Sequence, residues 1–180
     1  MSPRPSRRVI TAVASLALAA GTLAGCAGWS AHPGQAAVVS YTDADGTRQH
    51  TSISVETVED ATAELAPALG VASADVLEGL VYLPVLESLA AEYGIVVTDE
   101  DAVAALEGQL GPGDYSQASI DYARSILIGQ GASALDQEAL AEIQARYSEA
   151  ASAVDVEVAP RYNGVRPWIL STQAAGLEAG

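Results

Sequence analysis

The sequence predicts a mainly α-helical fold: a helical domain with a small antiparallel β element formed by an N-terminal hairpin and a C-terminal strand. Two β-like runs, residues 36–41 and 47–53, surround an Asp-Gly turn signal at residues 45–46. Apolar residues then recur at helical spacing, and residues 154–158 alternate valine with acids. Because an isolated hairpin is only marginally stable, we expect the last strand to return and pair with it.

Residues 1–25 predict a lipoprotein signal peptide, and residues 26–35 a lipidated cysteine and tether. Three arginines precede an apolar run, residues 9–23, that is too short for an ordinary transmembrane helix. The run ends in Leu-Ala-Gly-Cys, the pattern of a bacterial lipobox, which makes Cys26 the predicted lipidation site. A plain secretory signal is the alternative, and the arginine pair at residues 7–8 leaves the general and the twin-arginine export routes open.

Beyond residue 25 the chain is strongly acidic. It holds five arginines, no lysine and all 23 acids, and the difference between five and 23 is a formal net charge of −18. Such a surface repels nucleic acid and anionic headgroups, which excludes DNA and RNA as partners. Acylation at Cys26 would supply the attachment to the cell membrane. Because Cys26 is the only cysteine, packing rather than a disulfide has to stabilise the fold.

The most apolar segment beyond the signal, residues 74–97, predicts a long helix with a short extended exit. No side chain in residues 79–86 is charged or carries an amide. Either the rest of the chain covers this helix, or part of it is offered to another molecule. Pro84 predicts a bend within the helix, and Gly94 predicts the end of it.

Caps and breakers place the other helices. Ser54 predicts the start of a helix that Pro67 and Gly70 stop at about residue 66, and Ser73 or Asp75 caps the central helix.

Three more helices follow the central one. Thr98 with Asp101 resembles a capping box and starts a helix to about residue 109. Ser116 or Asp114 starts the next helix, and a last one spans residues 136–153. Pro160 ends the final strand.

No constellation predicts catalysis, so we expect a protein that is not an enzyme and that uses no cofactor. Residues 129–134 match G-x-G-x-x-A, but helical spacing continues through the residues before them. A glycine break between two helices is therefore favoured over a dinucleotide site. Arg161 and Arg166 are expected to pair with neighbouring acids.

No metal site is predicted either. His32 and His50 are the only histidines, and no further ligands stand at zinc spacing from them. Asp43 and Asp45 lack the other acids that an EF-hand loop requires.

Four segments occur in a distinctive order: AHPGQAAVV at residues 31–39, ISV at 53–55, GIVVTDE at 94–100 and VEVAPRY at 156–162. Together they resemble actinobacterial lipoproteins related to the N-terminal chaperone domain of SurA, and more distantly the trigger-factor chaperone module. The resemblance covers about residues 31–168. It implies a SurA-N-like helical domain at residues 36–170, before a flexible tail at residues 171–180.

The chain departs from that family at two places. Residues 41–52 are longer than the family's tight glycine turn, and Ala159 and Asn163 interrupt its Asn-Pro-Arg-Tyr-Gly segment. No parvulin-type domain follows, so prolyl isomerase activity is not implied.

The resemblance implies a cradle that holds unfolded or extended segments of exported proteins on the extracytoplasmic face of the membrane. The middle of the central helix is more apolar than one buried stripe requires, so one side of it can be spared for a client. The candidate client-binding residues are Leu80, Val81, Tyr82, Leu83, Val85 and Leu86. The alternative is a non-catalytic envelope scaffold that docks one folded partner through the same residues.

Overall fold

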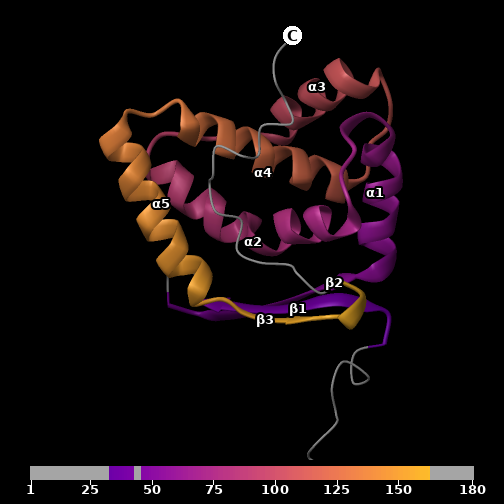
Figure 1. Ribbon diagram of the computed structural model, residues 1–180, viewed down its shortest axis with the longest axis horizontal. Coiled ribbons are helices and arrows are strands. Elements are labelled where there is room, and N and C mark those ends of the chain that lie inside the picture. The colour runs from indigo at the N-terminus through magenta and orange to yellow at the C-terminus, as the bar shows by residue number, and fades with distance from the viewer. Residues whose placement is uncertain (1–32, 43–45, 163–180) are drawn as a thin grey trace, which may run out of the picture.

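The computed structural model describes residues 33–42 and 46–162, and it confirms a mainly helical fold with a small antiparallel sheet (Figure 1). The elements follow in the order β1 (Gln35–Thr42), β2 (Arg48–Ser54), α1 (Val55–Leu69), α2 (Ser73–Glu92), α3 (Asp99–Leu110), α4 (Gln117–Ser133), α5 (Gln137–Ser152), β3 (Asp155–Val158) and the short 3-10 helix η2 (Pro160–Tyr162).

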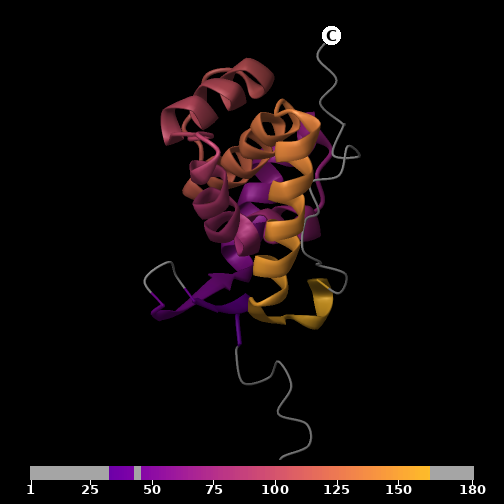
Figure 2. The same cartoon turned by 90° about the vertical axis from the view of Figure 1, so that its left-hand side faces the viewer.

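The helices form layers over one face of the sheet. In Figure 1 the sheet lies at the bottom, α2 crosses above it, α4 lies on α2, and α1 and α5 stand at the two ends. Helix α3 is outermost and packs mainly on α4. Figure 2 shows the β1–β2 hairpin extending beyond the helices. The hairpin therefore has parts that no helix covers.

The sheet has the order β2-β1-β3, with both pairs antiparallel. This confirms that the last strand returns to the hairpin, and it places β1 in the middle. Val39 lies opposite Thr51 on β2 and opposite Val156 on β3. The side chains of Ala37 and Val39 are buried against the helices. One face of the sheet thus belongs to the core, and the other faces solvent.

The predicted helix boundaries are confirmed at most ends. Ser54 caps α1, Asp136 caps α5, and Gly94 has the positive φ of 74° expected just after a helix. The end of α1 lies slightly later than predicted, because the helix continues through Pro67 to Leu69, and the second stop signal, Gly70, is its C-cap with a φ of 67°. A proline this near a helix end removes only one intrahelical hydrogen bond.

The predicted starts of α3 and α4 are confirmed, and that of α2 is not. Thr98 and Asp101 form the expected capping box of α3, and Ser116 caps α4. The prediction that Ser73 or Asp75 caps α2 is wrong, because Ala72 occupies the cap position. Asp75 still contributes to the start of α2 by accepting a hydrogen bond from the backbone N–H of Ala72.

The G-x-G-x-x-A segment lies inside α4, which runs without a break from Gln117 to Ser133. A dinucleotide site requires a strand before the glycines, so this interpretation is rejected, and so is a glycine break between two helices. The glycine at 131 has a packing role instead. A Cβ there would lie 2.8 Å from Cγ2 of Ile95, in the loop after α2.

Candidate functional site

Four of the six candidate client-binding residues are buried. The exposed fractions are 2% for Val81, 6% for Tyr82, 6% for Leu83 and 1% for Leu86. Leu80 and Val85 are half-buried and pack against the same core. The expectation that these six side chains together present a free surface is therefore wrong, because water does not reach most of them.

The burial of α2 follows from its composition. A helix that is apolar on every side is stable only when neighbours cover every side. Helix α4 packs along most of α2, α5 and α1 cover two further sides, and β1 lies beneath it. Of the two possibilities that its sequence leaves open, the described residues show the first, a core helix covered by the rest of the domain.

Little apolar surface remains exposed in the described part of the chain. Val96, at 73% exposure, is the one large hydrophobic residue there that is exposed. Its neighbour Ile95 is half-buried and contacts α4 at Gly131. A lone exposed valine is ordinary for a soluble surface and does not define a binding site.

One partly exposed ionic cluster joins three helices. Arg124 on α4 pairs with Glu87 on α2, and its Nη1 lies 3.3 Å from Oδ1 of Asp99 and 3.4 Å from Oδ1 of Asp121. The pKa of Glu87 is raised, because burial outweighs the opposing effect of the Arg124 cation. Three carboxylates around one guanidinium offset its charge, so the cluster holds helices together and offers no net positive charge to an anionic ligand.

A second cluster holds the end of the described chain on α1. Oη of Tyr162 donates to Oε1 of Glu59 over 2.8 Å, and Nη2 of Arg161 lies 3.2 Å from the same oxygen. The expected ion pair of Arg161 with a neighbouring acid is thereby confirmed. Burial, with the hydrogen bond to Glu59, raises the pKa of Tyr162 to about 12. These contacts clamp the end of the described chain onto α1.

The remaining predicted residues are the histidines, the lipidation site, Arg166 and the candidate calcium ligands. His50 is exposed, and its Nδ1 lies 2.7 Å from Oγ of Ser40. Cys26, His32 and Arg166, with the Asp43 and Asp45 pair, lie outside the described residues. Within residues 33–42 and 46–162, no three metal-binding side chains gather into a possible metal site.

No single helix in the described ranges is both long and apolar enough to cross a membrane; α1 and α2 pass that test only as a pair, bent by 115°.

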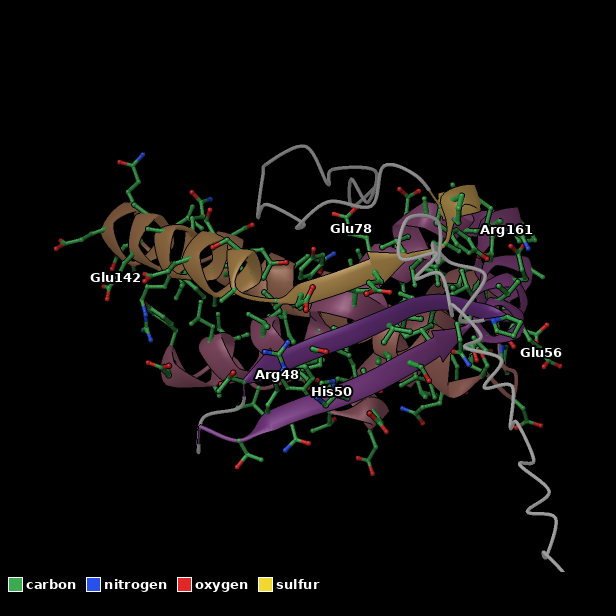
Figure 3. The ribbon with its side chains drawn as sticks, turned by 90° about the horizontal axis from the view of Figure 1, so that it is seen from below. Arg48, His50, Glu56, Glu78, Glu142 and Arg161 are labelled. Carbon is green, nitrogen blue, oxygen red and sulfur yellow. The ribbon has the colours of Figure 1, made fainter. Side chains whose placement is uncertain are left out.

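The feature best placed to bind another chain is the outer edge of β2. Strands β2 and β3 are the two edges of the sheet, and within the described chain β2 pairs only with β1 (Figure 3). From Arg48 to Ser52 every residue of β2 is exposed. Figure 3 shows Arg48 and His50 on the solvent side of this hairpin, away from the helices.

The polarity of residues 47–53 could have indicated from the sequence that β2 is an edge strand. Residues 47–53 have the composition of a strand but lack an apolar alternation until Ile53. A strand that is polar on both faces cannot lie in the middle of a sheet over a core, so it belongs at an edge.

No protein-family model matches the chain, and neither a curated protein nor a solved structure matches it.

Proposed function

We propose that this protein is a membrane-anchored, extracytoplasmic chaperone-like lipoprotein that binds unfolded or extended segments of exported proteins without catalysing a reaction. The observation that carries the proposal is the outer edge of β2, which is exposed from Arg48 to Ser52 and pairs with no further strand among the described residues. An extended polypeptide can add to such an edge as another strand, and the main-chain hydrogen bonds that hold it are largely independent of its sequence.

The N-terminal segment supports a location beside the membrane. The lipobox before Cys26 would lead to acylation of that cysteine, and β1 begins at Gln35, nine residues later. A tether of this length reaches roughly 30 Å when fully extended. The acidic chain, with its net charge of −18 beyond residue 25, stays in solution next to the headgroups.

The exposed surface favours an extended client over a folded partner. A stable interface with a folded protein buries about 800 Å² on each side and has an apolar centre. The described residues expose one large hydrophobic side chain, Val96. Strand addition needs no such patch, since hydrogen bonds along the backbone supply much of the affinity.

An aggregation assay tests the proposal. The chain from residue 26 onward, with Cys26→Ser to keep it soluble, is mixed with a chemically unfolded client that is then diluted out of denaturant. We expect light scattering to rise more slowly in the presence of the protein, without ATP. Unchanged aggregation at a molar excess of the protein would rule out the chaperone-like function.

Fractionation of cells tests the anchor separately. The protein with Cys26 is expected in the membrane fraction, and the Cys26→Ser variant outside it. Equal distribution of the two would contradict lipidation at this residue.

A further inference from the structure

Building on the proposed function, we infer that the outer edge of β2 binds an extended, proline-free segment of net positive charge, and that the backbone groups of Arg48, His50 and Ser52 pair with it.

The direction of the backbone groups follows from the pairing on the other side of the sheet. Ala159 N–H donates to the carbonyl of Ala36 over 2.8 Å, and the register of β1 with β3 places these two residues opposite each other. In an antiparallel pair, hydrogen-bonded and non-bonded positions alternate. Ala37 and Val39, one and three positions further along β1, therefore direct their backbone groups toward β2.

The same alternation then fixes β2. Ala37 and Val39 lie opposite Ile53 and Thr51, so those two residues use their backbone groups to bond β1. The N–H of Val55, two positions after Ile53, also donates to the β1 side, to the carbonyl of Gly34 over 2.9 Å, as this alternation requires. The N–H and C=O groups of Arg48, His50 and Ser52 consequently point to the outer edge of the sheet, away from β1.

The two edges of the sheet are not equivalent. Strand β3 has four residues and carries Asp155 and Glu157, whereas β2 has seven residues and no acid. Edge strands are commonly protected from pairing by proline, bulges or an inward-pointing charge. Strand β2 contains no proline, the irregularity in its pairing with β1 lies in β1 between Gln35 and Ala37, and its charged Arg48 points to the solvent face, where it meets Asp155. It is the less protected edge.

The charge of the domain selects the client. The net charge of −18 beyond residue 25 attracts a cationic segment from solution and repels an acidic one. The one positive side chain of β2 near the edge, Arg48, is partly offset by Asp155 at 3.3 Å. On the inner face, the half-buried Ile53 offers a contact to an apolar residue of the added strand. Alternating apolar and basic residues therefore fit best.

A second copy of the chain fits the edge less well. Two protomers would each bring a net charge of −18 to the contact. A pair of seven-residue edges also buries far less than the roughly 1,200 Å² that a stable protein interface needs. We therefore assign the edge to an extended polypeptide.

Proline substitution tests the edge directly. His50→Pro removes an N–H that points outward, and a proline is tolerated at such an edge position. His50→Ala is the matched control, because it also loses the contact with Ser40 but keeps the N–H. Circular dichroism melting must show that both variants are folded.

The binding probe is a fluorescent peptide of about nine residues that alternates valine and lysine, a length that spans a typical strand. It is measured by anisotropy against the chain from residue 26 with Cys26→Ser. We expect binding about tenfold weaker with His50→Pro than with His50→Ala. The matching valine–glutamate peptide is expected to bind at least about tenfold more weakly at low salt, a difference that shrinks as salt is added.

Methylated peptides keep the test decisive even if His50→Pro fails to fold. Methylation of alternate backbone nitrogens on one edge of the lysine peptide blocks pairing with the wild-type chain, while methylation on the opposite edge leaves binding intact. Equal effects of the two patterns would overturn strand addition, and equal binding of the lysine and glutamate peptides would overturn the charge selection.

Three more outcomes bear on this inference, and two of them separate it from the proposed function. Slower client aggregation together with unaltered peptide binding by His50→Pro would overturn the β2 site and leave the chaperone-like function standing. If the molar mass of the protein doubles as its concentration rises, and His50→Pro stays a monomer, a second copy occupies the edge and the inference is overturned. Peptide binding as expected without any effect on aggregation would support the site and contradict the function.

Discussion

Gly79 of α2 lies directly against the ring of Tyr122 of α4. A Cβ added at Gly79 would stand 2.8 Å from Cδ2 of Tyr122 and 3.1 Å from Oγ of Ser125, and both neighbours are buried. The glycine therefore sets how closely the two central helices approach. Such contacts transmit volume changes directly, because a close-packed core has no free space.

Gly79→Ala should destabilise the protein by about 1–3 kcal/mol, although alanine is the better helix former. The overlap with Tyr122 outweighs the gain in helix propensity. Gly108→Ala on α3 is the control, since a Cβ there meets nothing within 4 Å. It should stabilise by about 0.5–1 kcal/mol. Urea unfolding of both variants measures the difference, and an equal effect of the two substitutions would contradict the packing argument.

Leu86→Asn should lower the free energy of unfolding by about 3–5 kcal/mol, because Leu86 is buried and the amide would find no partner. Val96→Asn replaces an exposed residue and should change it by less than about 0.5 kcal/mol. Thermal melts of the two variants measure this. A folded Leu86→Asn protein of wild-type stability would restore the middle of α2 as a candidate client surface.

Most helix starts and the last strand could be predicted, because the signals for them lie within a few residues of each other in the sequence. Ser54, Thr98, Ser116 and Asp136 each cap a helix through a side chain that bonds the first turn, and this chemistry is visible in the sequence. Residues 154–158 gave the returning strand for a similar reason, since the period changes there from helical to alternating.

The candidate site could not be predicted in the same way. Composition established that α2 needs cover on every side, but whether the cover is α4 and α5 or a client depends on tertiary packing. The pairing of β1 with both neighbours also decides which backbone groups of β2 face outward, and this register involves residues more than 100 positions apart, such as Val39 and Val156. No local pattern contains that information.

Glu64→Gln should destabilise the protein at neutral pH by about 1–2 kcal/mol and flatten its loss of stability in acid. Oε2 of Glu64 accepts bonds from Oγ of Ser119 (2.5 Å) and from the N–H and Oγ of Ser116, at the start of α4. Burial raises the pKa of Glu64, but these three hydrogen bonds together lower it by more, so the pKa lies below its usual value of 4.5. The ionised carboxylate therefore stabilises the fold above pH 4.5, and this contribution is lost as the pH falls through the lower folded pKa.

Urea unfolding between neutral pH and acid measures this contribution of Glu64. Asp60→Asn is the control, an exposed acid on the same helix, and it should change stability by less than about 0.5 kcal/mol. If the free energy of unfolding falls equally steeply with acid in wild type and in Glu64→Gln, the bonds from Ser116 and Ser119 do not stabilise the fold through the ionised carboxylate.

Tyr162→Phe should make the protein less sensitive to alkali. Burial and the bond to Glu59 raise the pKa of Tyr162 from 10 to about 12. The folded state therefore favours the protonated phenol, and this stabilisation is complete below pH 10 and is lost as the pH rises through about 12. Tyr122, whose pKa burial also raises to about 12, remains in the variant, so the alkaline slope should decrease without vanishing.

Unfolding measured from pH 8 to 12 tests this, with Tyr41→Phe as the matched control on β1. At pH 8 the loss of the bond to Glu59 should cost Tyr162→Phe about 0.5–1.5 kcal/mol. The difference from wild type should then narrow as the pH rises, because wild type alone loses the stabilisation by Tyr162. A difference that stays constant up to pH 12 would mean that the phenol of Tyr162 ionises as readily in the folded chain as in the unfolded one, and the clamp on Glu59 would then be no more than a contact of the neutral ring.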